Sequence, residues 1–147
     1  MYQRILIATD GSPLSDQAVE SGLSLAALCN ASAVVVKVVP LYTRSFLEGG
    51  DYTSLEDVKR IEDQWVHGAQ QSLDDIQALG AARGVTVTTS VMKSDLIAET
   101  LIDVAKEHGC DLIVMASHGR KGLKRLLLGS ETQHVLTHTT VPVLVLR

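Results

Sequence analysis

Short runs of apolar, mainly β-branched residues alternate along the chain with longer segments in which apolar residues recur every three to four positions. The short runs are typical of buried strands, and the longer segments are typical of helices that pack one face on a core. This alternation predicts repeated βαβ units, and therefore an α/β fold with an open, mostly parallel sheet and helices on both faces. Five strands are expected, at 4–9, 33–39, 86–92, 111–116 and 142–146.

Four helices are expected between the strands, and capping residues indicate where they begin and end. The first begins at Pro13 behind Ser12 as N-cap and runs to about Cys29, where Asn30 can adopt the left-handed conformation that stops a helix. The other three are expected after Ser54 as far as Gly84, from Ser94 and Asp95 to Gly109, and from Ser130, which we take as the N-cap of a capping box formed by Ser130-Glu131-Thr132-Gln133.

Length and composition indicate one domain that spans residues 1–147. The chain has a mass of 15.8 kDa and is 46% hydrophobic and 20% charged, as is usual for a packed globular protein. No apolar stretch approaches the roughly 18 residues that span a bilayer, so no membrane segment is expected. Only five apolar or small residues separate Arg4 from Asp10, too few for the apolar region of a signal peptide, and a cytoplasmic location is expected.

The charge balance limits the partners that the surface can attract. A formal net charge of −4 argues against a surface that gathers nucleic acid or anionic lipid, so any anion site must be local. Cys29 and Cys110 lack the spacing of a metal site or a disulfide framework, and we interpret both as small buried side chains.

The segment after the fourth strand carries the most informative pattern. Ala116-Ser117-His118-Gly119 is followed, after nine residues, by Gly129-Ser130 at the start of a helix. Glycine lets a backbone approach an anion closely, and a helix start adds unpaired N–H groups and partial positive charge, so the layout suits phosphate. Ordinary loop structure in front of an N-cap remains an open alternative. Basic residues between the two glycines could reach a polyphosphate: Arg120, Lys121, Lys124 and Arg125.

Other candidate chemistry is weaker. Asp10, at the end of the first strand, could bind a ribose hydroxyl or a metal-bridged phosphate, or could simply form a turn with Gly11 and Ser12. Ser117 and His118 do not form a hydrolase pair in our interpretation, because neighbouring residues rarely place nucleophile and base correctly. The remaining histidines are expected on helix surfaces, and the pair with four-residue spacing lacks a third metal ligand; they are His67, His108, His134 and His138.

Several functional classes are excluded by absent motifs. The chain has neither a P-loop nor a strand followed by G-x-G-x-x-G, and it lacks the acidic residues of a response-regulator receiver.

The segment 40–53 fits neither strand nor helix, and it contains three aromatic residues, Tyr42, Phe46 and Tyr52. A loop of this length is uncommon unless it is functional, so we expect this one to become ordered over a ligand or a partner.

Four segments together resemble the universal stress protein family: Ile5 to Ser12, Ala116 to Gly119, Gly129-Ser130 and Val141 to Val145. The resemblance implies a Rossmann-like fold of the adenine nucleotide alpha hydrolase type with strand order 3-2-1-4-5. It also implies a homodimer, which we expect through the last strand, from Pro142 to Leu146. In one branch of the family it implies an ATP site, with or without Mg²⁺. The site residues expected on this basis are Asp10, Val38, Ala116, Ser117, His118, Gly119, Arg120, Gly129, Ser130 and Glu131.

One position departs from the family's pattern Gly-x-x-Gly-x9-Gly-[Ser/Thr], because its first glycine is Ala116. If that position needed a positive φ, alanine would cost about 1–2 kcal/mol. Two functions stay open: an ATP-binding regulatory module, with at most slow hydrolysis and no assigned general base, and a dimeric stress scaffold that binds no nucleotide. An adenylating enzyme of related fold is disfavoured, because Thr9-Asp10-Gly11-Ser12 does not match its loop after the first strand.

Overall fold

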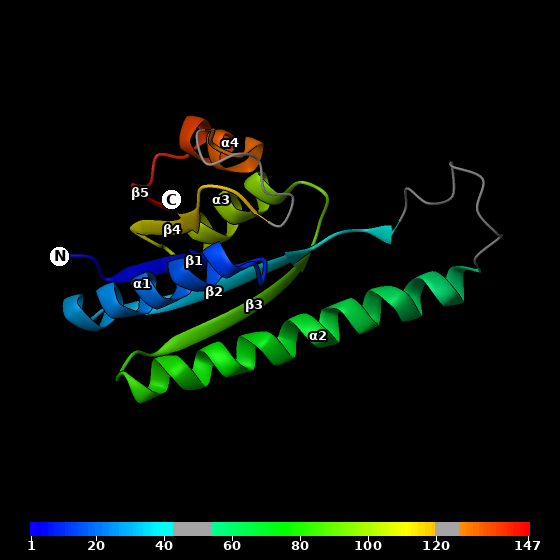
Figure 1. The fold of residues 1–147 in the computed structure, drawn as a ribbon, viewed down its shortest axis with the longest axis horizontal. Helices are drawn as coiled ribbons and strands as arrows, with labels where there is room; N and C mark the ends of the chain where they lie inside the picture. The colour runs from blue at the N-terminus through cyan, green and yellow to red at the C-terminus, as the bar shows by residue number, and fades with distance from the viewer. Residues whose placement is uncertain (43–53, 120–126) are drawn as a thin grey trace.

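The computed structural model describes residues 1–42, 54–119 and 127–147. Within these ranges β1 is followed by alternating helices and strands, as the hydrophobic pattern predicts (Figure 1). Every predicted strand is present, with each end within one residue of its expected position. The elements are β1 (Arg4–Ala8), α1 (Pro13–Cys29), β2 (Ser32–Val39), α2 (Leu55–Ala82), β3 (Val87–Lys93), α3 (Ile97–Glu107), β4 (Leu112–Ala116), α4 (Ser130–His138) and β5 (Val143–Leu146).

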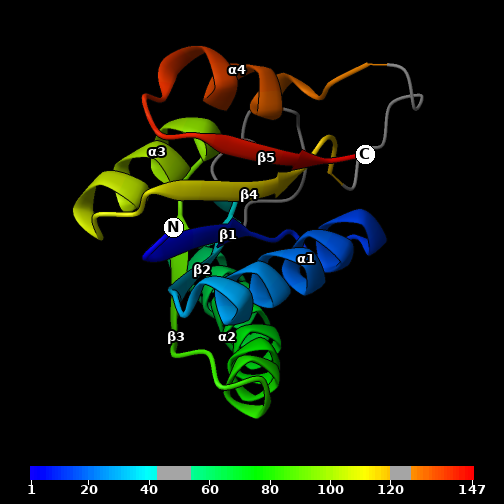
Figure 2. The ribbon, with the colours of Figure 1, turned by 90° about the vertical axis from the view of Figure 1, so that its left-hand side faces the viewer.

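The strands form one sheet of order β3-β2-β1-β4-β5, and all four pairings are parallel. This confirms the predicted fold class. Figure 2 shows α1 and α2 on one side of the sheet and α3 and α4 on the other. The described part of the chain contains no helix that is long and apolar enough to cross a membrane.

The core consists of two layers, because side chains of a strand alternate between the faces of the sheet. Along β1, Ile5 and Ile7 pack with α1 and α2, whereas Leu6 packs with α3 and α4. All three side chains are completely buried. Helix α1 lies very close to β1, since a Cβ atom added at Gly22 would be 2.6 Å from Ile7 Cδ1.

The two cysteines lie in different layers and are both free thiols. Burial raises the pKa of the Cys110 thiol to about 11; the positive charge of Arg4 opposes this rise and the negative charge of Asp111 adds to it. The Cys110 thiol therefore stays protonated at neutral pH. Because its folded-state pKa is raised, the stability that the neutral thiol contributes is lost as pH rises from about 9 towards 11.

Both predicted ends of α1 and the predicted start of α2 are confirmed, whereas α2 ends at Ala82, two residues before Gly84. The Ser12 and Ser54 hydroxyls each accept a hydrogen bond from an N–H in the first turn that they precede, and Asn30 ends α1 with a φ of 52°. The predicted start of α3 is wrong, because α3 begins at Ile97. Ser94 Oγ instead accepts a hydrogen bond from the Leu96 N–H, so this residue shapes the turn that precedes the helix.

Most of the segment 40–53, for which ordering over a ligand or partner is expected, lies outside the described residues.

Candidate functional site

The candidate site lies at the carboxyl edge of the sheet, where β1 and β4 are neighbours. The chain proceeds outward from β1 to β2 and β3 on one side, and then returns to place β4 on the other side of β1. Open parallel sheets bind ligands at such a reversal of strand order. The loops that follow β1 and β4 both begin here.

Asp10 sits in a tightly bonded turn at the end of β1. Its Oδ1 accepts a hydrogen bond from the Ser12 N–H at 2.9 Å, and Gly11 between them has a φ of 76°, which favours glycine. The Thr9 hydroxyl accepts a hydrogen bond from the Gly11 N–H, and the Ser15 hydroxyl accepts one from the Asp10 N–H. The Asp10 carboxylate is thereby held at the edge of the sheet, so forming a turn does not prevent it from facing a ligand.

Gly119 comes into direct contact with Asp10. A Cβ atom added at Gly119 would overlap Asp10 Oδ2, and the φ of Gly119 is not in the left-handed region. A side chain at this position would therefore require the Asp10 carboxylate to move, whereas the backbone conformation itself does not require glycine. The loops after β1 and β4 are thus brought together.

The start of α4 packs against the end of β4. The Gly129 N–H donates to the Ser117 carbonyl at 2.7 Å, and the buried Thr132 hydroxyl lies 3.0 Å from the Ala116 carbonyl and 3.2 Å from the Ser117 carbonyl. A Cβ atom added at Gly129 would be 3.2 Å from the Ser117 carbonyl oxygen and 3.4 Å from His118 Cα. Thr132 was not among the predicted site residues, although its place in the expected capping box marked it as a polar residue near the helix start.

The prediction that Ser130 is the N-cap of α4 is wrong. Gly129 occupies that position in an extended conformation, with a φ of −61° and a ψ of 154°, and Ser130 is already helical. An N-cap residue must be non-helical, so Ser130 cannot cap the helix. Ser12, Ser54 and Glu131 supply side-chain acceptors to the first turns of α1, α2 and α3. Among the described helices, α4 is the one whose first turn receives no side-chain acceptor.

Val38 presents its backbone at the same edge. The Thr9 N–H donates to the Val36 carbonyl, and the Ser94 N–H donates to the Val39 carbonyl, so Val36 faces β1 and Val39 faces β3. Because successive residues of a strand point their backbone groups to opposite sides, the Val38 N–H and C=O point to the β1 side. The paired part of β1 ends opposite Val36, before it reaches Val38. The Val38 N–H and C=O are therefore a hydrogen-bond donor and acceptor beside the Asp10 turn.

Ala116 is an ordinary strand residue, which pairs with Leu146 in the β4–β5 ladder. Asn30 is the one non-glycine residue with a positive φ in the described ranges. Ala116 therefore does not carry the cost of about 1–2 kcal/mol that alanine would have at a position with a positive φ.

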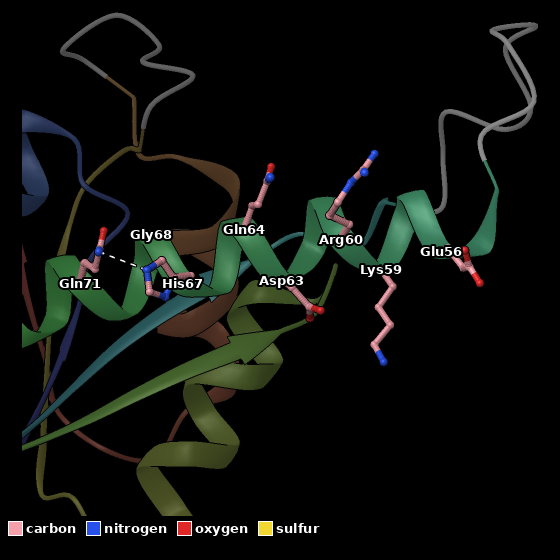
Figure 3. A pocket seen from close by; sticks show the side chains of 8 residues that line it. All are labelled: Glu56, Lys59, Arg60, Asp63, Gln64, His67, Gly68 and Gln71. Atoms are coloured by element: carbon pink, nitrogen blue, oxygen red, sulfur yellow. Dashed lines mark hydrogen bonds between the residues drawn. The ribbon is translucent and has the colours of Figure 1, made fainter.

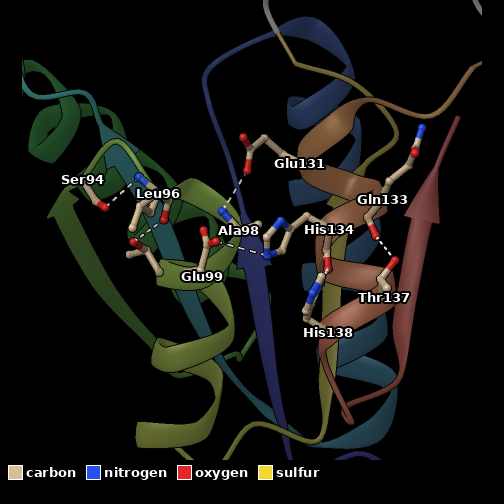
Figure 4. Close-up of polar contacts among 10 residues, drawn as sticks. Ser94, Leu96, Ala98, Glu99, Glu131, Gln133, His134, Thr137 and His138 are labelled. Carbon is tan, nitrogen blue, oxygen red and sulfur yellow. Dashed lines mark hydrogen bonds and ion pairs between the residues drawn. The ribbon is translucent and has the colours of Figure 1, made fainter. Parts of the chain in front are cut away.

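The remaining predicted site residues have different surroundings. Ser117 is buried and its Oγ lies 3.2 Å from Nδ1 of the half-buried His118. The Glu131 carboxylate points to α3, where it accepts a hydrogen bond from the Ala98 N–H (Figure 4). Arg120 and the other basic residues at 121, 124 and 125 lie outside the described residues.

Two other features of the described residues do not form a candidate site. The rings of His134 and His138 stack with centroids 4.1 Å apart, but no group of three potential metal ligands occurs within the described ranges. A shallow hollow on the outer side of α2 is lined by Glu56, His67 and neighbouring residues, all from this one helix (Figure 3). It contains none of the predicted site residues.

Together, the sheet order and the two glycine contacts define a doubly wound α/β domain whose loops meet at the switch point. A model of the universal stress protein family matches residues 1–147, and the chain belongs to this family. Its sequence is 30% identical to the universal stress protein YxiE of Bacillus subtilis, and the match covers 100% of both chains.

Solved structures of the family have the same fold. The universal stress protein MJ0577 of Methanocaldococcus jannaschii superposes with a TM-score of 0.84 at 25% identity, over 99% of this chain and 96% of that chain. A universal stress protein in complex with cAMP gives a TM-score of 0.70 at 22% identity, over 99% and 97% of the two chains. One from Archaeoglobus fulgidus in complex with dAMP gives 0.65 at 19% identity, over 99% and 98%.

Proposed function

We propose that this protein binds an adenine nucleotide, ATP, at the carboxyl edge between β1 and β4. The observation that carries the proposal is the start of α4, whose first-turn N–H groups receive no side-chain acceptor in the described structure and lie beside two glycines in close contact with neighbouring loops. Helix starts of this kind bind phosphate through backbone N–H groups and the helix dipole.

Each part of the nucleotide has a matching group in the proposed site. The N–H groups of Ser130 and Gly119 would bind the phosphates, because no side chain at Gly119 or Gly129 obstructs the approach. Asp10 would bind the ribose hydroxyls, and the Val38 N–H and C=O would bind the adenine edge. The complexes of two relatives with cAMP and with dAMP support an adenine ligand.

Mg²⁺ would enter this site with the nucleotide. Magnesium commonly uses one or two carboxylates together with phosphate oxygens and water. Asp10 is a carboxylate of this kind, whereas the described residues contain no group of three metal-binding side chains. The proposed site therefore fits a magnesium ion that is carried in by the phosphates.

The proposed function is binding without efficient catalysis. The Ser117 hydroxyl contacts only the imidazole of its own neighbour His118, and no third side chain orients that imidazole among the hydrogen bonds of the described residues. A nucleophile and base need such support to act together. We assign no general base and expect at most slow hydrolysis.

The scaffold without nucleotide is the second candidate function, and Ala116 was its main support. Because Ala116 lies in a regular strand, replacing it with glycine removes no strain. We expect the native chain and Ala116→Gly to bind ATP with affinities within about threefold of each other in titration calorimetry, since a difference under about 0.7 kcal/mol is expected. If neither protein binds ATP at millimolar concentration, the nucleotide proposal is wrong and the scaffold function replaces it.

We also propose that the protein is a homodimer through β5. This strand lies at an edge of the sheet and Leu144 on it is 39% exposed, so an unpaired β5 would favour aggregation. Leu144→Lys is expected to convert a dimer to a monomer in analytical sedimentation at micromolar concentration. Leu28→Lys, on the exposed end of α1, is the matched control and should leave the dimer intact. A native chain that sediments as a monomer would refute this interface.

A further inference from the structure

Helix α3 begins without a cap of its own. Its N-cap residue, Leu96, makes no side-chain hydrogen bond to the first turn. The Ala98 N–H in that turn instead donates to Glu131 Oε2 at 2.9 Å (Figure 4). A carboxylate from the first turn of α4 therefore performs the capping role for the neighbouring helix, where the helix dipole also favours negative charge.

A second contact joins the same two helices one turn further along. His134 Nε2 lies 3.2 Å from Glu99 Oε1. Glu131 and His134 are three residues apart and lie on one side of α4, while Ala98 and Glu99 are adjacent on α3. We call these four residues the α3–α4 clasp.

The clasp includes the turn that the proposed phosphate site uses. α4 is only nine residues long, and the clasp adds two anchors to the hydrogen bonds that Gly129 and Thr132 make with the end of β4. It also directs the Glu131 carboxylate towards α3. A free carboxylate in this turn would repel a bound phosphate, because like charges at short range disfavour each other.

We propose that Glu131 is a positioning residue for phosphate binding, which holds the first turn of α4 in place through the Ala98 N–H and keeps its own charge directed away from the anion. This inference rests on the proposed nucleotide site. It assigns Glu131 an indirect role, in place of the direct contact with the cofactor that the sequence suggested.

Two substitutions distinguish the positioning role of Glu131 from the effect of its negative charge. Glu131→Ala removes the acceptor and frees the Ala98 N–H, whereas Glu131→Gln keeps an acceptor oxygen and removes only the charge. We expect Glu131→Ala to lower ATP affinity about tenfold, which corresponds to the loss of one charge-assisted hydrogen bond. Glu131→Gln should bind ATP at least as tightly as the native chain. Glu107→Ala, an exposed carboxylate at the other end of α3, is the matched control and should change nothing.

The measurement is the affinity for adenosine, ADP and ATP by calorimetry, together with the amide NMR signal of Ala98. Adenosine does not reach α4, so its affinity should be the same in every variant. A general loss of folding stability would weaken adenosine and ATP alike, whereas loss of the positioning role weakens ATP selectively. In the native chain ATP should shift the Ala98 signal, and in Glu131→Ala it should not.

The outcomes distinguish this inference from the proposed function. If the native chain binds ATP more tightly than adenosine and Glu131→Ala leaves that difference unchanged or enlarges it, the positioning role is wrong and the nucleotide site stands. If the native chain binds neither compound, the proposed function itself is wrong, and the role of Glu131 is rejected with it.

Discussion

Replacing Gly129 with valine is expected to lower ATP affinity by at least about a hundredfold, the equivalent of two lost charge-assisted hydrogen bonds, while the fold remains intact. An added Cβ atom would already lie 3.2 Å from the Ser117 carbonyl oxygen, and the valine methyl groups would obstruct the N–H groups that face the phosphates. The fold should tolerate the change, because a φ of −61° with a ψ of 154° is accessible to any residue.

The matched control is Gly68→Val. A Cβ atom added at Gly68, on the exposed side of α2, would have no atom within 4 Å beyond its chain neighbours and the backbone of its own helical turns. Titration calorimetry should show native affinity for this variant, and thermal unfolding should show that both variants are folded. Undiminished ATP binding by a folded Gly129→Val protein would exclude the start of α4 as the phosphate site.

The second large effect concerns stability. Ile7→Ala is expected to lower the free energy of unfolding by about 2–5 kcal/mol, because the side chain is completely buried between β1 and α1 and its removal leaves a cavity. Urea unfolding followed by circular dichroism would measure the loss. A change below 1 kcal/mol would mean that the surrounding side chains collapse into the space.

Gly22→Ala should destabilise the native chain but stabilise the Ile7→Ala variant. In the native chain the new methyl group would be 2.6 Å from Ile7 Cδ1 and should destabilise the protein by about 1–3 kcal/mol. In Ile7→Ala the space is empty, and alanine is favoured over glycine in a helix by about 1 kcal/mol, so the same change should stabilise. Additive effects of the two substitutions would show that Gly22 and Ile7 are not coupled.

Local signals predicted most of the secondary structure. Ser12 before Pro13, Ser54 before an amphipathic segment and Asn30 after α1 act on backbone groups within a few residues, so their roles can be read from the sequence. The order of the strands was not evident from such signals. Nothing local to β1 or β4 indicates that they pair, and the expected order depended on the family resemblance.

The predictions at α3 and α4 failed where a tertiary contact replaced a local one. Ser130 and Glu131 fit a capping box, but Gly129 supplies the extended residue that α4 needs, and the Glu131 carboxylate has a better partner in the uncapped start of α3. A sequence pattern cannot show that a neighbouring helix lacks its own cap. The meeting of Asp10 with Gly119 was predictable because both follow strands that end at one edge.

The pairing of β1 with β4 also has a consequence for the order of folding. β1, β2 and β3 are consecutive along the chain and can pair soon after they leave the ribosome, but Ile5 must wait for Leu112. Contacts between such distant positions cost more loop-closure entropy and form late. The edge that faces the proposed nucleotide is therefore completed only when the last third of the chain docks, and a ligand bound there would favour that docking by mass action.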